Sequence, residues 1–268
     1  MIEPVVRYGL EFNPFIKNTK DIIMETSDMA EARARLKYLG STRGFGILTG
    51  SPGRGKSTSA RIWASSLNPS LFKVVYSSLS TLTVMDFYRQ IASGLGAAPS
   101  FRKNDLFDDI QREIKRLALE KRITPVIIID EADKLNHKVL GDLQIMFNFE
   151  MDSRDLAVIL LVGQPRLNTT LNQSTHESLR QRIVMNYHMC GISKEEGRTY
   201  IKKKLEGAGC QQTVFDTNAT EAILNSANGT PRMINKICNR SLMIGASLGK
   251  SIIDSDTVQK AIDDTQLE

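Results

Sequence analysis

Gly50-Ser-Pro-Gly-Arg-Gly-Lys-Ser57 fits the phosphate-binding loop pattern G-x-x-x-x-G-K-[ST] at every fixed position. The loop follows a strand-like run at 45–49 and precedes a helix-compatible segment at 58–66, which is the context that this motif requires. Glycines let successive backbone N–H groups turn towards phosphate oxygens, and the helix N-terminus adds the positive end of its dipole. The sequence therefore predicts a nucleotide-binding protein.

Different residues of this loop are expected to bind the phosphates and the metal ion. Lys56 is expected to reach the outer phosphates, and the Ser57 hydroxyl to ligate Mg²⁺. The residues expected to contact the nucleotide are Gly50, Ser51, Pro52, Gly53, Arg54, Gly55, Lys56, Ser57 and Thr58.

Two acids follow a second apolar run, Thr124-Pro-Val-Ile-Ile-Ile-Asp130. A short, continuous β-branched run is typical of a strand buried on both faces of a parallel sheet. The carboxyl end of such a strand is where an open α/β sheet carries its functional groups. Asp130 is expected to hold Mg²⁺ through its water shell, and Glu131 to be free to polarise the attacking water.

Strand-like and helical patterns alternate over the first two thirds of the chain. The strand-like runs are 45–49, 72–76, 126–129, 157–162 and 186–189. Strands separated by helices predict an α/β fold with a five-stranded, doubly wound parallel sheet and helices on both faces. After Gly191 only helical patterns remain, at 194–205, 220–226, 231–246 and 255–264. We therefore expect two domains, an α/β domain at 1–191 and a small all-helical domain at 192–268.

Composition limits the class of protein. The 268 residues carry a net charge of +5, which permits an anionic partner such as nucleic acid without requiring one. The three cysteines are far apart in sequence and are expected to be reduced, buried thiols. No apolar run approaches a membrane span and the N-terminus lacks the pattern of a signal peptide, so a cytoplasmic location is expected.

Three polar features appear later in the chain. Gln164 follows the fourth strand-like run, where its amide is expected to lie beside the phosphate loop. Arg180 and Arg182 come just before the fifth run, and Arg232, in Gly229-Thr-Pro-Arg232, opens a helix of the second domain.

The order of these motifs resembles the AAA+ ATPases over almost the whole chain. The resemblance implies an AAA+ P-loop NTPase fold with a helical lid, and ATP with Mg²⁺ as the bound nucleotide and metal. It also implies that Gln164 is the first sensor, that Arg182 or Arg180 is an arginine finger, and that Arg232 is a second sensor that contacts nucleotide. A finger acts on a neighbouring subunit's nucleotide, which implies a homo-oligomer. Many AAA+ proteins have Asn, Ser or Thr as first sensor, so Gln164 departs from the broad pattern.

Further motifs narrow the resemblance to the ATPase module shared by general secretion ATPase A and by TnsC-type and TniB-type regulators of DNA transposition. They are Phe12-Asn-Pro-Phe15, Asp130-Glu-Ala-Asp133, Asn148-Phe-Glu150, Leu161-Val-Gly-Gln-Pro165, Gln181-Arg-Ile183 and Gly229-Thr-Pro-Arg232. Secretion ATPases continue into a membrane segment and a periplasmic domain, which these 268 residues lack, so the transposition branch is favoured. The expectation is then ATP-dependent assembly into a ring or filament on double-stranded DNA, with recruitment of a transposase and selection of a target, alone or with a target-selector protein.

Two alternatives remain. One is a secretion-pathway assembly ATPase that does not act on DNA. The other is a replication initiator or helicase loader, which is disfavoured because those proteins usually carry a dedicated extension for DNA or partner.

DNA contacts are expected from hydroxyl and cationic side chains near the second strand and the following helices: Ser78, Thr81, Arg102 and Lys103. The segment 101–104 is equally well explained as a solvated basic turn. No base-reading motif is present, so DNA binding is expected to be independent of sequence and sensitive to salt. Lys202 to Lys204 are expected to form the exposed face of a helix.

Overall fold

The computed structural model describes residues 3–17, 20, 22–78, 83–98, 100–150 and 153–265. The chain forms two compact units. The α/β unit comprises Met29–Ser51 and Gly55–Met189, and the helical unit comprises Met1–Asp28, Pro52–Arg54 and Cys190–Glu268. This grouping differs from the predicted division at residue 191 because the N-terminal segment packs with the C-terminal helices.

Five parallel strands form one sheet: β1 (Gly44–Gly50), β2 (Phe72–Ser77), β3 (Thr124–Ile129), β4 (Val158–Gly163) and β5 (Ile183–Met189). Their order is β2-β3-β4-β1-β5, and every strand pairing is parallel. β1, β3 and β4 are buried along their whole length, as continuous apolar runs predict. The predicted α/β class and five-stranded parallel sheet are confirmed.

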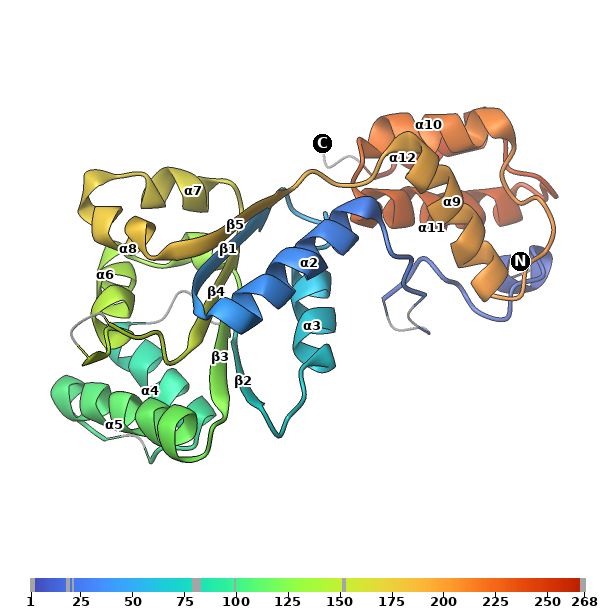
Figure 1. The fold of residues 1–268 in the computed structure, drawn as a ribbon. Coiled ribbons are helices and arrows are strands. Elements are labelled where there is room, and N and C mark those ends of the chain that lie inside the picture. Colours follow the sequence, from blue (N-terminus) through green and yellow to red (C-terminus); the bar gives the residue numbers. More distant parts are fainter. Residues whose placement is uncertain are drawn as a thin grey trace. The chain divides into compact units, whose positions relative to one another are not determined.

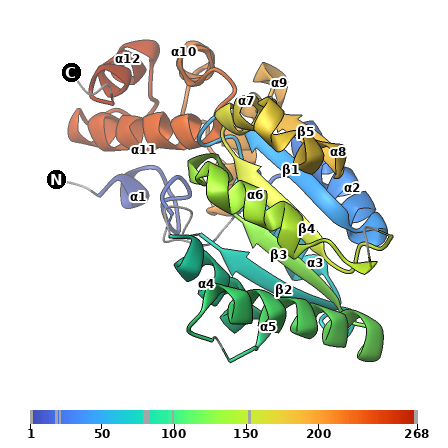
Figure 2. The same cartoon turned by 90° about the vertical axis from the view of Figure 1, so that its left-hand side faces the viewer.

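Helices cover both faces of this sheet (Figures 1 and 2). On one face, α2 (Ser27–Thr42) and α3 (Lys56–Ser66) pack on alternate strand residues such as Val158, Leu160 and Val162. The other face meets α4 (Val84–Leu95), α5 (Lys103–Lys115), α6 (His137–Met146), α7 (Arg166–Leu171) and α8 (Glu177–Gln181). Ile159 and Leu161, the intervening residues of β4, belong to that second core. Strand alternation thus supplies two apolar layers from one buried strand.

Helix α5 is followed directly by a π-helical segment, Arg116–Glu120. The apolar residues Leu106, Ile110 and Ile114 of α5 recur at helical spacing on one face and are fully buried, as expected of an amphipathic helix.

The helical unit contains α9 (Lys194–Gly207), α10 (Thr217–Ala227), α11 (Pro231–Ser247) and α12 (Ser255–Asp263). Ser193 and Glu196 form a capping box at the start of α9, and Asp216 and Asp254 cap α10 and α12. The N-terminal segment, which includes the short helix α1 (Pro4–Arg7), contributes buried apolar residues to the core of this unit: Tyr8, Leu10 and Phe15.

Two expectations for this unit are wrong. Lys204 is not on the exposed face of α9: only 7% of it is accessible, and its ammonium group donates to the carbonyl of Pro14 at 3.2 Å. The N-terminal segment, far away in sequence, covers it. Cys190 is exposed, whereas Cys210 and Cys238 are buried as predicted.

Within the described part of the chain, no helix has both the length and the hydropathy of a membrane span.

Candidate nucleotide site

The loop between β1 and α3 has the backbone that its glycine pattern predicts. Gly55 lies in the left-handed region, with φ of 96°, directly before Lys56 begins α3. The first backbone bond of the helix runs from Ser59 N–H to the Gly55 carbonyl at 2.8 Å, so the N–H groups of the first turn point out of its N-terminus. Such an N-terminus, with the positive end of the helix dipole, favours an anion.

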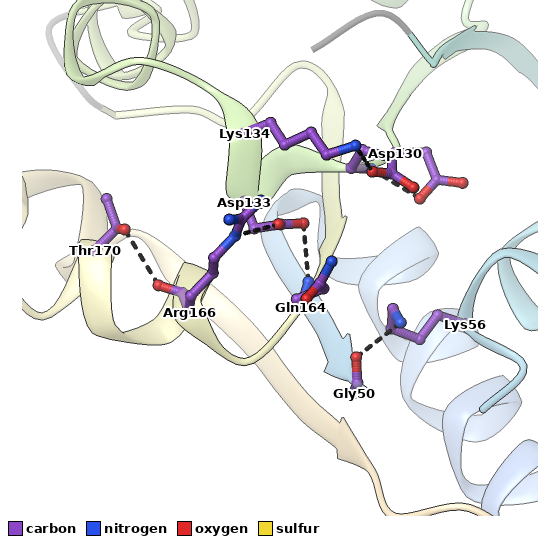
Figure 3. Close-up of polar contacts among 9 residues, drawn as sticks. Gly50, Lys56, Asp130, Asp133, Lys134, Gln164, Arg166 and Thr170 are labelled. Atoms are coloured by element: carbon purple, nitrogen blue, oxygen red, sulfur yellow. Dashed lines mark hydrogen bonds and ion pairs between the residues drawn. The ribbon is translucent and has the colours of Figure 1, made fainter. Parts of the chain in front are cut away.

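The ammonium group of Lys56 lies over this loop (Figure 3). Its Nζ donates to the carbonyl oxygens of Gly50 at 2.7 Å and of Ser51 at 3.0 Å. The same helical turn carries Ser57, which is exposed, and Thr58, which is half-buried. A cation, a hydroxyl group and a helix N-terminus are therefore gathered at one end of β1.

Gly53 packs within the helical unit against the start of α11. Its φ is 80°, and a Cβ atom there would lie 2.7 Å from the Cβ of Arg232 and 3.0 Å from Cγ2 of Thr230. The Arg232 N–H donates to the Gly53 carbonyl at 3.4 Å. Any side chain at position 53 would force these residues apart. Thr230 precedes α11 without a side-chain cap bond.

Asp130 follows β3 and is 8% exposed. One carboxylate oxygen accepts the phenol hydroxyl of Tyr76 at 3.0 Å, and the other accepts the Glu131 N–H at 2.9 Å. Partial burial and the Asp130 carboxylate raise the pKa of Tyr76 to about 12, so its phenol remains a donor at neutral pH. Tyr76 lies on the neighbouring strand β2 and fixes the carboxylate of Asp130 from the side.

Glu131 is not free, in contrast to the sequence expectation. Its carboxylate forms an ion pair with the Lys134 ammonium group, and its side chain is 49% exposed. The pair forms because a left-handed backbone at Glu131, with φ of 56°, starts the 3₁₀ turn Ala132–Lys134. Exposed pairs of this kind contribute about 0.2–1 kcal/mol, so the carboxylate can leave Lys134 at small cost.

Gln164 follows strand β4, which lies between β1 and β3 in the sheet. The phosphate-binding loop follows β1, and Asp130 and Glu131 follow β3. Thr49 of β1 is level with Gly163 of β4, and Ile129 of β3 is level with Leu161. The strand ends therefore lie on one edge, and Figure 3 shows Lys56, Asp130 and Gln164 there. Gln164 thus follows the strand next to β1, and its proximity to the loop and its role as first sensor stay predictions.

Arg180 and Arg182 flank the end of α8. The Arg182 guanidinium donates to the carbonyl of Gln144 in α6 at 2.9 Å, and that of Arg180 to the carbonyl of Asn172 at 3.1 Å. Both side chains are half-buried and both make a local contact, so the geometry does not separate the two candidates for an arginine finger.

The residues expected to contact DNA differ in their surroundings. Ser78 and Arg102 are exposed, and Thr81 lies outside the described residues. Lys103 pairs with the Asp142 carboxylate at 2.6 Å and lies 5.5 Å from the centre of the Tyr88 ring. A phosphate would have to compete with Asp142 for this cation, so Arg102 is the stronger of the two basic candidates.

A family model described as an AAA domain matches residues 37–171, half of the chain. The chain belongs to the AAA domain family. The matched segment runs from α2 to α7 and contains the loop at the end of β1, the acids after β3 and Gln164. Together with the observed strand order, this match establishes an AAA+ P-loop NTPase fold.

Similar proteins agree with this assignment. General secretion pathway protein A of Aeromonas hydrophila is 33% identical over 247 residues, covering 90% of this chain and 45% of that protein. The chain spans less than half the length of the curated relatives that it matches. Among solved structures, Cdc6p of Pyrobaculum aerophilum has a TM-score of 0.72 at 15% identity, covering 95% of this chain and 71% of that one. The ORC1 protein of Aeropyrum pernix, solved in complex with DNA, has a TM-score of 0.68 at 17% identity, covering 98% and 69%.

The AAA domain contains polar contacts at this edge that sequence reasoning missed. The contact of Tyr76 with Asp130 was not predictable, because the alternating pattern of strand β2 does not show which of its residues lies next to the acid at the end of β3. The sequence analysis predicts no role for Asp133, whereas in the structure its carboxylate accepts hydrogen bonds from Gln164 and Arg166. Its position three residues after the strand's terminal acid, in Asp130-Glu-Ala-Asp133, was the available sequence signal.

Proposed function

We propose that this AAA domain binds ATP and hydrolyses it in a Mg²⁺-dependent reaction. The observation that carries this proposal is the order of β1, β4 and β3, which gathers the Lys56 cation, Gln164 and the acids Asp130 and Glu131 at one edge of the sheet. That set combines a phosphate-binding cation with a water-orienting amide and a carboxylate base.

The donors present suit Mg²⁺, which prefers oxygen ligands and keeps several waters. The Ser57 hydroxyl and the Asp130 carboxylate would hold it, with Tyr76 fixing the orientation of Asp130. With Mg²⁺ held by these residues, the site would supply positive charge that offsets the negative charge developing during phosphoryl transfer. Lys56 and the first turn of α3 would bind phosphate, while Glu131 would accept the proton of the attacking water after leaving Lys134.

Phosphate release by the purified protein tests this function. Steady release with ATP and Mg²⁺, abolished by chelation with EDTA, is expected. If no phosphate is released even at protein concentrations high enough for oligomers to form, the proposal is contradicted.

Arg182→Ala and Arg180→Ala test the arginine finger. A finger stabilises charge that develops only during phosphoryl transfer, so its loss should lower turnover by roughly 10³-fold and leave monomer affinity near normal. Phosphate release and titration with a fluorescent nucleotide measure the two quantities. The variant that loses turnover identifies the finger. Equal loss of affinity would place that arginine in its own subunit's site, and full turnover in both variants would refute the assignment.

We propose further that double-stranded DNA is the partner, and that ATP-dependent assembly on DNA regulates transposition by recruiting a transposase to its target. The net charge of +5, the exposed Arg102 and the motif resemblance to TnsC-type and TniB-type ATPases support this role. The fold shared with an ORC1 protein solved on DNA is compatible with it.

A secretion-pathway assembly ATPase that does not act on DNA is the second candidate. The observation in its favour is the 33% identity to general secretion pathway protein A over 90% of this chain. The motifs quoted for the transposition branch occur in both groups, so the partner must be tested directly.

Fluorescence anisotropy with random-sequence duplex DNA separates the two candidates. DNA binding that requires a non-hydrolysable ATP analogue and weakens steeply with salt is expected. Arg102→Ala should weaken it, whereas Lys203→Ala, at an exposed lysine of α9, is the matched control. Binding that is absent, or equal with and without nucleotide, would remove the DNA proposal and favour the secretion role.

A further inference from the structure

Asp133 carries a buried charge two residues after the proposed base Glu131. Its side chain is 1% exposed and belongs to the 3₁₀ turn after β3. Burying a carboxylate is costly unless both oxygens are bonded. Here Oδ1 accepts the Gln164 backbone N–H at 2.9 Å, and Oδ2 accepts the Nε–H of Arg166 at 2.6 Å (Figure 3). Both partners come from the segment that follows β4.

Gly163, the last residue of β4, permits this close approach. A Cβ atom at that position would lie 2.9 Å from Oδ1 and 3.0 Å from the backbone nitrogen of Asp133. The first distance is shorter than real Cβ contacts allow and the second is tighter than most of them, and the neighbours here are a bonded carboxylate and the main chain. The turns after β3 and β4 are therefore locked to each other through one side chain.

The backbone of Gln164 is fixed at both of its polar groups. Its N–H donates to Asp133, and its carbonyl accepts the Leu167 N–H at 2.9 Å at the start of α7. That backbone sets the Cα–Cβ direction of Gln164, from which its side chain extends. The acids Asp130 and Glu131 belong to the same turn as Asp133, so one carboxylate sets the amide of Gln164 relative to the proposed metal ligand and base.

We propose that Asp133 is a positioning residue, which holds the Gln164 amide in the orientation needed for ATP hydrolysis. The inference rests on the proposed ATPase function. A residue that only stabilised the fold would not affect the rate of hydrolysis through Gln164, as Asp133 is proposed to do. Asp133 touches neither nucleotide nor water in this role and acts only through Gln164.

A double-mutant cycle tests the proposal through kcat, KM and thermal stability. Asp133→Ala in the wild-type background should lower kcat by at least about tenfold, with KM for ATP within about twofold. In a Gln164→Ala background, Asp133→Ala should lower kcat by no more than about twofold further, because the group that it positions is gone. Asp133→Asn, which retains an acceptor for the Gln164 N–H, should restore part of the lost kcat and serves if the alanine variant does not fold.

Arg166→Ala is the matched control, since it removes the other partner of Asp133 and keeps the bond to Gln164. It should lower the melting temperature but leave kcat within about twofold. Equal losses of kcat from Asp133→Ala in both backgrounds, or a loss of melting temperature alone, would overturn the positioning role. Absence of ATP hydrolysis in the wild-type protein would instead overturn the proposed function on which it rests.

Discussion

Lys56→Ala is expected to abolish measurable nucleotide binding. In the structure this ammonium group is held over the loop by the carbonyls of Gly50 and Ser51, at the N-terminus of α3. A hydrogen bond to a charged group contributes about 1.5–3 kcal/mol, and a lysine on two phosphate oxygens makes at least two. Affinity should therefore fall by at least roughly 10²-fold, which a fluorescent-nucleotide titration detects.

Lys134→Ala is the matched control for this variant. Lys134 is also a lysine near the same edge of the sheet, but its ion pair is with Glu131. Removal of Lys134 should leave nucleotide affinity near that of the wild type. Equal losses from the two substitutions would show a general effect of positive charge, and normal affinity of Lys56→Ala would contradict the loop assignment.

Glu131→Gln is expected to bind ATP normally and to stall hydrolysis. The amide has the shape of the carboxylate but cannot accept the proton of the attacking water, and a general base typically contributes about 10²–10⁴-fold to the rate. Loss of the exposed pair with Lys134 should change folding stability by no more than about 1 kcal/mol. Phosphate release and nucleotide titration, measured on the same preparation, test both halves of the prediction.

The same variant should trap the ATP-bound assembly, which sedimentation or electron microscopy would reveal as persistent oligomers. Glu120→Gln, at an exposed glutamate of the π-helical segment, is the control and should turn over normally. Turnover at the wild-type rate in Glu131→Gln would overturn the assignment of the base.

Strands β1, β3 and β4 could be predicted because they are buried on both faces. Strands β3 and β4 are almost entirely apolar, so their sequences show no periodicity. Their short length and their β-branched residues nevertheless indicate strands rather than helices. The loop glycines and Lys56 were predictable because phosphate binding constrains both backbone and side chain. The place of Gln164 after the fourth strand was predictable, and in the structure that strand lies between β1 and β3.

Contacts between residues distant in sequence were not predictable from local patterns. Lys204 has the sequence surroundings of an exposed lysine, yet the N-terminal segment buries it. The bond of Tyr76 to Asp130 depends on the pairing of β2 with β3, and that of Asp133 to Gln164 on the pairing of β3 with β4. The ion pair of Glu131 with Lys134 depends on the left-handed backbone of Glu131 itself. A glycine usually indicates such a backbone in the sequence, and none is present at this position.

Isothermal titration calorimetry with a non-hydrolysable ATP analogue tests the central claim most directly, because it detects binding without requiring turnover, DNA or a partner. The wild-type protein with Mg²⁺ should show saturable heat with one nucleotide per chain, and Lys56→Ala under the same conditions should show none. Absence of heat from the wild-type protein, or equal heat from the two proteins, would contradict a nucleotide site at the loop between β1 and α3.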